Sequence, residues 1–294
     1  MSNVVREITV KSVLNKHKKR DSWFLDDYSL NPYKNCQFNC TYCYIHGNKY
    51  GEHIPQEVCV KVNAPRVLYR ELRRRSMRNK YGFIAVSSST EAWMPIEEKY
   101  EVTRRCLEVV SRFSFPVHCG TKSTLILRDV DLLHEISQNA VLPSDLRDKL
   151  KDGVLITISL STIDEDTAKI FEPNAPPPKE RLKLLWRLRE EGFQAGIAYI
   201  PVLPFISDSS EKLEEMIKTA KEYDASYVFV GSLTLFGAGK KNFYRLLEKR
   251  FPELLPKYKS LFRIFTQPSK EYQEKLNRLA RKLCEKHKVQ YRIV

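Results

Sequence analysis

Three cysteines lie within eight positions of one another, in the stretch 31–50, which reads NPYKNCQFNCTYCYIHGNKY. Cys36, Cys40 and Cys43 have the spacing C-x3-C-x2-C, whereas the whole chain of 294 residues has seven cysteines. Soft thiolates at such short spacing suit zinc or an iron–sulfur cluster. Three thiolates with no obvious fourth ligand favour a cluster with one iron left open. Such a site keeps a coordination position for a substrate or cosubstrate.

A zinc site is the alternative for the same loop. His46 lies three residues after Cys43 and would complete a Cys3His set, because structural zinc takes four ligands. However, C-x3-C-x2-C-x2-H is not an ordinary zinc-finger spacing. Tyr42, directly before the last cysteine, is a residue that an iron–sulfur cosubstrate site would use to pack an adenine. We therefore expect a 4Fe–4S cluster and keep zinc as the less favoured alternative.

The elements around this loop alternate between strand and helix patterns. A short strand near 28–32 leads into the cysteine loop, and strands are predicted at 83–86, 115–119, 154–160, 193–200 and 227–230. Helices are predicted between them, at 64–79, 95–111, 128–138, 178–191 and 209–223. This α/β alternation predicts a parallel sheet wrapped by helices, which closes toward a barrel or partial barrel.

Polar residues recur at the carboxyl ends of the predicted strands, where functional residues gather in parallel barrels. In strand order they are the cysteine loop, the segment 87–91, Lys122, then Ser159 with Ser161, and finally Tyr199. Scattered polar residues would not fall repeatedly at one rim. We therefore expect these residues to surround a common site.

Positive charge is concentrated at the two ends of the chain. The net charge is +14, and residues 240–294 hold 16 lysines and arginines against 5 acidic residues. Residues 1–24 hold 6 against 2, so the middle is close to neutral. We predict a basic N-terminal segment at 1–25, a barrel at 26–238 and a basic, mainly helical extension at 239–294. This pattern suggests a polyanionic partner such as nucleic acid docked beside a catalytic core. A solubility surface, or a charge-rich thermophile surface, is the alternative.

Composition indicates where the protein works. No run of 18 apolar residues is present, so no transmembrane helix is expected. The first 20 residues lack the apolar core of a signal peptide. We expect a cytoplasmic protein with reduced thiols, and the odd number of cysteines argues against a disulfide framework.

The motif CQFNCTYC matches the C-x3-C-x-aromatic-C signature of radical S-adenosylmethionine (radical SAM) enzymes. More narrowly, the chain resembles the spore photoproduct lyase family, described as DNA repair photolyase-like radical enzymes. The resemblance covers about 11–237, in stretches such as KVNAPRVLYREL, TEAWMPIEEKYEVTRRCLEV, TKSTLILRDVDLL, ITISLSTIDEDTAKIFEPNAPPPKERL and YIPVLPFISD. It implies a partial (β/α)6 TIM-like barrel of the radical SAM type.

The resemblance also implies roles for single residues. The three cysteines would bind three irons of a 4Fe–4S cluster, and the fourth iron would take the amino and carboxylate groups of S-adenosylmethionine. Tyr42 would lie beside the adenosyl group. Lys122 and Ser159 match positions that contact the methionine part or the ribose. Further positions are Glu172 and Arg181, in a motif that closes the rim. Apart from the resemblance, Tyr199 and Trp93 are candidate pocket residues, Tyr199 as a cofactor-binding residue, with core packing as the alternative.

The implied activity is reductive cleavage of S-adenosylmethionine to a 5′-deoxyadenosyl radical, which takes hydrogen from a substrate. Nucleic acid is the substrate class we expect, as a DNA lesion to be repaired by a lyase or an RNA to be modified. A peptide or small metabolite is the alternative, and a zinc-stabilised nucleic-acid-binding protein is a more remote one. A low-potential electron donor such as ferredoxin or flavodoxin is the implied partner.

One family feature is missing. Spore photoproduct lyase uses a cysteine in the loop after its second barrel strand as hydrogen donor, and the matching stretch here, SSSTEAW, contains none. Cys119, on the next predicted strand, is interpreted as a packed core thiol. The resemblance therefore does not extend to this hydrogen donor.

Overall fold

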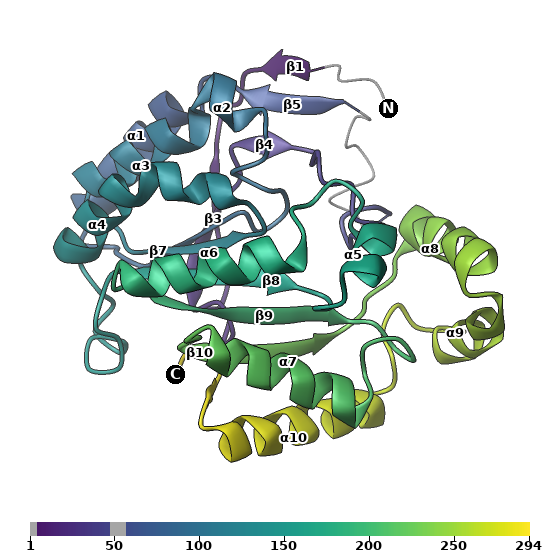
Figure 1. Cartoon of the computed structure of the whole chain (residues 1–294). Coiled ribbons are helices and arrows are strands. Elements are labelled where there is room, and N and C mark those ends of the chain that lie inside the picture. Colours follow the sequence, from purple (N-terminus) through teal and green to yellow (C-terminus); the bar gives the residue numbers. More distant parts are fainter. Residues whose placement is uncertain (1–4, 48–56) are drawn as a thin grey trace.

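An open, curved sheet forms the centre of the protein (Figure 1). The structure is a computed structural model that describes residues 5–47 and 57–294. The 8-stranded sheet has the order β11-β10-β9-β8-β7-β6-β3-β2. Its strands, in chain order, are β2 (Leu14–Lys16), β3 (Asp26–Leu30), β6 (Phe83–Val86), β7 (Val117–Thr121), β8 (Val154–Leu160), β9 (Gln194–Val202), β10 (Tyr227–Ser232) and β11 (Gln290–Tyr291). All neighbours pair in parallel except β2 with β3.

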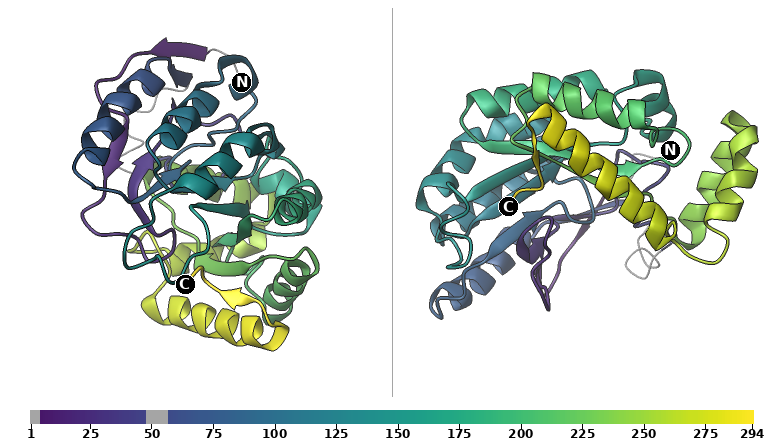
Figure 2. Two further views of the ribbon diagram at one scale, coloured as in Figure 1. Left: turned by 90° about the vertical axis from the view of Figure 1, so that its left-hand side faces the viewer. Right: turned by 90° about the horizontal axis from the view of Figure 1, so that it is seen from below.

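Helices cover the outer face of this sheet (Figures 1 and 2). In chain order the helices of the described residues are α1 (Ala64–Ser76), α2 (Glu97–Tyr100), α3 (Val102–Arg112), α4 (Val130–Asn139), α5 (Glu165–Phe171), α6 (Pro178–Glu190), α7 (Ser210–Glu222), α8 (Gly237–Arg250), α9 (Leu255–Leu261) and α10 (Lys270–His287). Of these, α8 and α9 do not cover the sheet (Figure 1). Short 3-10 helices span Thr124–Asp129 (η1) and Pro252–Leu254 (η2). A 3-stranded sheet of β1 (Val5–Ile8), β5 (Val58–Lys61) and β4 (Tyr33–Lys34) lies to one side.

The strands and helices form where the apolar pattern places them. β8 reads VLITISL and is buried along nearly its whole length, as expected for a parallel strand covered on both faces. α7 buries Leu213, Met216, Ile217 and Ala220, the i, i+3, i+4, i+7 pattern of a one-sided helix. Its first turn is capped by the Ser209 hydroxyl, which accepts from the Lys212 N–H at 3.2 Å.

The two faces of the sheet carry different side chains. Residues two apart on a strand share a face, so Leu155, Thr157 and Ser159 of β8 all point to the same side. Leu155 belongs to an inner cluster with Leu25, just before β3, and with Phe229 of β10. The inner face is therefore filled by apolar side chains toward the amino ends of the strands, and becomes polar at their carboxyl ends.

The C-terminal region returns to the sheet. α10 packs against α7 and β10, and β11 extends the sheet by pairing with β10 through Tyr227 and Gln290. By contrast, α8 and α9 pack beyond the carboxyl ends of β8, β9 and β10, beside α5 (Figure 1). There they form a second hydrophobic cluster that includes Tyr42 and Phe171.

The predicted fold class is confirmed: the protein is α/β, with a parallel sheet, repeated β–α units and an open, partial barrel. The predicted strands at 83–86 and 154–160 match β6 and β8 residue for residue. The predicted helix at 95–111 is instead split into α2 and α3 at Glu101, whose φ of 49° is left-handed. The buried Glu97 carboxylate accepts the Thr103 and Arg104 N–H groups at 3.0 and 3.1 Å and so caps α3. Across residues 5–47 and 57–294, no helix has the length and apolar character needed to span a membrane.

Candidate functional site

The three cysteines lie on the loop between β4 and β5. Each is half-buried, and all seven cysteines of the chain are free thiols. Asn35 and Asn39 take left-handed φ angles of 63° and 49°, a conformation that asparagine tolerates better than most residues. The N–H of Cys43 donates to the Cys40 carbonyl at 3.1 Å, so the second and third thiols sit on one turn. The end of the cysteine stretch, 48–50, lies outside the described residues.

Hydrogen bonds fix this loop to the end of α5. The Thr41 N–H donates to the Phe171 carbonyl at 2.9 Å, and the Tyr42 hydroxyl donates to Glu172 Oε1. The Asn174 amide donates to the Gln37 carbonyl at 3.0 Å. The motif FEPNAPPPKER therefore supports the cysteine loop directly.

α8 supports the same loop from the other side. The Gly239 N–H donates to the His46 carbonyl at 3.1 Å. A Cβ atom at Gly239 would lie 2.4 Å from that carbonyl oxygen, so glycine is required for this close approach. The cysteine loop is thus held between α5 and the start of α8.

A buried ion pair lies beneath Tyr42. Glu172 and Arg181 are 2% and 0% exposed, and Arg181 Nη2 donates to Glu172 Oε2. Arg181 Nη1 also donates to the Ser159 carbonyl at 2.9 Å, and the Ser161 hydroxyl donates to Glu172 at 2.9 Å. Burial opposes ionisation of Glu172, but the nearby cations Arg181 and Lys122 outweigh it, so the pKa of Glu172 is lowered. The pair joins the cysteine loop to the end of β8.

Lys122 and Ser159 meet on the inner face of the sheet. Lys122 Nζ donates to the Ser159 hydroxyl at 2.8 Å, from the ends of β7 and β8. The buried Glu91 holds the lysine backbone in place, because it accepts the Lys122 N–H at 2.9 Å and the Thr121 hydroxyl at 2.7 Å. Burial raises the pKa of Glu91 in spite of these donors. Glu91 was predicted at the rim, but this role was not; the only signal for it in the sequence is a single carboxylate among small and apolar residues.

Tyr199 and Trp93 do not join this group. In the register of β8 and β9, Ser159 pairs with Ala198, and Tyr199 pairs with Leu160 on the opposite face. Tyr199 is 1% exposed in the outer hydrophobic cluster, and its hydroxyl donates to the Ser207 carbonyl at 2.7 Å. The structure therefore places Tyr199 on the helix-covered face of the sheet, away from Lys122.

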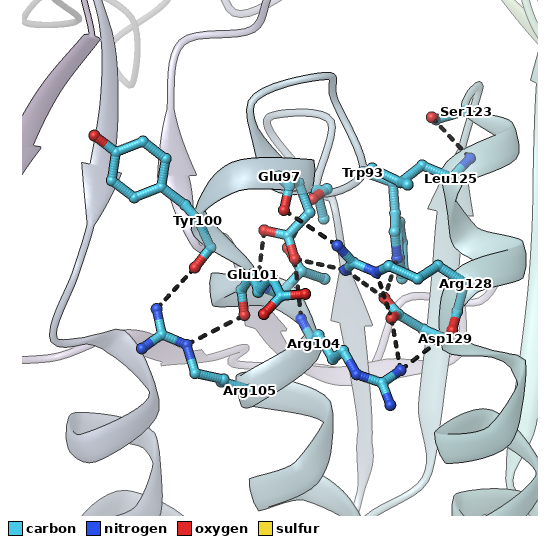
Figure 3. Close-up of polar contacts among 12 residues, drawn as sticks. Trp93, Glu97, Tyr100, Glu101, Arg104, Arg105, Ser123, Leu125, Arg128 and Asp129 are labelled. Carbon is cyan, nitrogen blue, oxygen red and sulfur yellow. Dashed lines mark hydrogen bonds and ion pairs between the residues drawn. The ribbon is translucent and has the colours of Figure 1, made fainter.

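Trp93 belongs to a buried polar network outside the rim (Figure 3). Its indole N–H donates to Asp129 at 2.9 Å, and Arg128 bridges Asp129 and Glu97 at 2.8 Å each. The roles of Asp129 and Glu97 were not predicted from the sequence. The network ties the loop after β6 to η1. It borders a cleft of about 560 Å³ that is lined by Trp93 itself, by Phe38 of the cysteine loop, and by Pro95, Glu98, Ser123, Leu125, Pro176, Glu180 and others. Trp93, predicted as a pocket residue, therefore does line a pocket, but the three cysteines, Lys122 and Ser159 do not line it.

The residues of the rim fit an iron–sulfur cluster and its cosubstrate. Burial raises the pKa of Cys36 to about 11 and of Cys40 to about 12, and Lys122 counteracts this at Cys40. Without metal these thiols are protonated, and a thiophilic metal would displace the protons. Within the described part of the chain, no three Cys, His, Asp or Glu side chains are arranged to hold one metal ion. Three thiolates that bind three different irons do not need to converge on one point.

Two further features suit a cosubstrate, namely a buried hydroxyl that has no hydrogen-bond partner within the described residues and an open space beside β7. The Thr90 hydroxyl, next to Glu91, is buried with no hydrogen-bond partner. Buried polar groups are normally paired, so this one suits a ligand. A Cβ atom at Gly120 would have a single neighbour within 4 Å, the Val86 carbonyl oxygen at 3.9 Å. The inner face beside the end of β7 is therefore open.

The comparisons with known proteins agree with this geometry. Residues 30–220 match the family described as the Radical SAM superfamily. An uncharacterised protein of Mycobacterium tuberculosis is 28% identical over 290 residues, covering 96% of this chain and 81% of the relative. A solved spore photoproduct lyase variant superposes with a TM-score of 0.73 at 14% identity, covering 99% of this chain and 82% of that one. Another variant, solved with S-adenosylmethionine and a dinucleoside spore photoproduct, gives a TM-score of 0.69, again at 14% identity, with 99% and 81% covered.

The structural likeness, at this low identity, shows the shared fold, whereas the family match rests on the sequence of well over half the chain. That match includes the cysteine loop, Lys122, Ser159 and the Glu172–Arg181 pair. It favours the cluster over the zinc alternative. The chain belongs to the radical SAM superfamily, whose enzymes work with a 4Fe–4S cluster and S-adenosylmethionine.

Proposed function

We propose that this enzyme acts on nucleic acid, either by repairing a DNA lesion or by modifying RNA. The observation that carries the proposal is the position of its positive charge. Residues 240–294 hold 16 basic residues against 5 acidic ones. α8, which begins this region, donates from Gly239 to the cysteine loop at His46, 3.1 Å away. A polyanion attracted to this region is thereby brought to the reactive rim.

We assign the rim residues as follows. Cys36, Cys40 and Cys43 hold the cluster, which together with S-adenosylmethionine supplies a 5′-deoxyadenosyl radical when bound. The Lys122 ammonium donates a charge-assisted hydrogen bond to the cosubstrate carboxylate, and Ser159 orients that lysine. Tyr42 lies beside the adenosyl group, with its hydroxyl held by Glu172.

The remaining cysteines do not supply a hydrogen donor at the rim. Cys59, Cys106, Cys119 and Cys284 are each 1% exposed or less. Cys119 lies with Val86 and Ile156 in the outer cluster, on the helix side of the sheet. We therefore propose that the reaction ends without the cysteine route of spore photoproduct lyase.

The domain organisation and the electron donor complete the proposal. We propose that the basic residues of 1–25 and 239–294 flank the barrel at 26–238, while β2 and β11, which belong to these segments, add to its sheet at the two edges. We also propose a low-potential donor such as ferredoxin or flavodoxin, because reductive cleavage of a sulfonium needs one electron at low potential.

The test is anaerobic reduction of the loaded enzyme with S-adenosylmethionine, followed by measurement of 5′-deoxyadenosine. Single-stranded DNA, duplex DNA, RNA and peptide pools are compared. We expect nucleic acid to stimulate product formation and Cys43→Ala to abolish it, whereas Cys119→Ala, on the outer face, keeps it. Stimulation by peptide alone would refute the proposed substrate class and favour the peptide alternative.

A further inference from the structure

Within the basic region 240–294, α9 and the loop that follows it form one distinct surface. We call residues 255–267, together with Phe205 of the loop after β9, the α9 edge. Between Glu253 and Glu271 the chain has no acidic residue and four basic ones, at Lys257, Lys259, Arg263 and Lys270. Lys257, Lys259 and Arg263 are exposed. Within the described residues no carboxylate forms an ion pair with any of these three.

Large apolar side chains are exposed among these cations. Ile264 is 72% exposed, Phe265 is 69% exposed and Phe205 is 43% exposed. Lys257 Nζ lies 5.6 Å from the centre of the Phe205 ring. Both residues line a hollow of about 440 Å³ together with Pro256, Ser260 and Leu261. Isolated exposed apolar residues are common, but two exposed aromatic rings together with three cations that have no acidic partner among the described residues indicate a binding surface.

The α9 edge is fixed to the reactive end of the barrel. The fully buried Tyr258 donates its hydroxyl to the Pro204 carbonyl at 2.6 Å, in the loop after β9. The Leu235 N–H, beyond β10, donates to the Thr266 carbonyl at 2.8 Å. α9 is joined through η2 to α8, whose first turn contacts the cysteine loop at His46. Figure 1 shows α8 and α9 projecting at the carboxyl ends of the strands.

We propose that the α9 edge binds an unpaired stretch of nucleic acid, with bases stacked on Phe265 and Phe205 and phosphates on Lys257, Lys259 and Arg263. This inference rests on the proposed function and adds to it the form of the substrate. Sequence-tolerant binding of single strands combines aromatic stacking with a cationic track. Paired bases would not offer their faces to a ring, so a duplex would use the cations alone.

The direct test is the binding of fluorescein-labelled oligonucleotides to the loaded enzyme, followed by fluorescence anisotropy at several salt concentrations. We expect the single strand to bind more tightly than its duplex. Phe265→Ala and Phe265→Leu should each weaken single-strand binding about tenfold, because stacking depends on the ring rather than on apolar area, and Phe265→Tyr should restore it. Replacing Lys257, Lys259 and Arg263 together by Gln should lower the salt slope by about 2, near 0.7 for each phosphate contact of a single strand.

The chain offers a matched control. Met77 is 76% exposed and lies just after three arginines at the end of α1. Met77→Ala therefore removes an exposed apolar side chain that is close to positive charge but does not belong to the α9 edge. We expect no change in binding. Iron content and 5′-deoxyadenosine formation without substrate should be unchanged in every variant, which shows that folding and cluster loading are intact.

The outcomes separate the two proposals. If the wild type binds the single strand and Phe265→Ala binds it equally well, the inference about the α9 edge is wrong while the proposed function stands. If the wild type binds neither strand form, both are wrong. If the variants bind the oligonucleotide normally but slow electron transfer from reduced flavodoxin, the edge is a protein-docking surface and the inference is overturned.

Discussion

Glu172→Gln is the sharpest test of the architecture beneath the cysteine loop. The Glu172 and Arg181 side chains are each about 1% exposed, so the variant leaves a guanidinium with no counterion in the interior. Loss of one partner of a buried ion pair costs about 3–5 kcal/mol. Glutamine still offers an oxygen to Tyr42 and Ser161, so this cost reports the charge rather than the loss of both hydrogen bonds. Adding Arg181→Met should cost less than the two single effects combined, because both changes remove the same interaction.

The pH dependence supplies a second readout of the same pair. The pKa of Glu172 in the folded protein lies below its ordinary value of 4.5. The ion pair therefore stabilises the fold at neutral pH, and this contribution is lost as the pH falls below 4.5 through the lower folded value. Unfolding of the metal-free protein in urea, followed by circular dichroism from pH 7 to pH 3, should show a flatter acid limb for Glu172→Gln.

Glu180→Gln is the matched control, since Glu180 lies in the same motif and is exposed. Its free energy of unfolding should change by less than about 0.5 kcal/mol, as surface substitutions usually do. A loss of less than about 1 kcal/mol in Glu172→Gln would refute the reasoning. It would mean that water reaches Arg181 or that Glu172 is protonated in the folded protein.

Three other perturbations test the rim lysine, the support of the cysteine loop by α8, and the buried His118 of β7, whose ring hydrogen-bonds to the Phe24 carbonyl and the Thr157 hydroxyl. Lys122→Ala should raise the Kd for S-adenosylmethionine about tenfold or more, because it removes one charge-assisted hydrogen bond. The iron content measured in the same samples should stay constant. Gly239→Ala places a methyl group 2.4 Å from the His46 carbonyl oxygen and should cost about 1–3 kcal/mol of stability in urea unfolding, with a lower iron content after reconstitution. Burial lowers the pKa of His118 from 6.5 to about 4, so this histidine must gain a proton on unfolding. The free energy of unfolding therefore decreases as the pH falls from 6.5 toward 4, because only the unfolded chain binds this proton. His118→Gln should make the free energy of unfolding of the metal-free protein less dependent on pH over that range.

Much of the fold follows from local patterns in the sequence. β8 and α7 were predicted from the apolar run VLITISL and from the i, i+3, i+4, i+7 spacing that begins at Leu213. Once the strands are parallel, their carboxyl ends meet at one edge, which is why Lys122 and Ser159 were predicted at a common site. In the structure Lys122 Nζ lies 2.8 Å from the Ser159 hydroxyl. The cysteine spacing is local as well, so it identified the metal chemistry without any knowledge of the fold.

Contacts that depend on side-chain direction were not predictable in the same way. Consecutive residues on a strand point to opposite faces, so one step along β9 separates Ala198, on the inner face with Ser159, from Tyr199, among the helices. Proximity to a strand end is therefore insufficient evidence for a site residue. Glu91 shows the converse, because only the fold reveals that its carboxylate holds the Lys122 backbone. A carboxylate that is buried next to a rim lysine is costly for the fold. That cost argues for Glu91 as a positioning residue of the site rather than a packing residue.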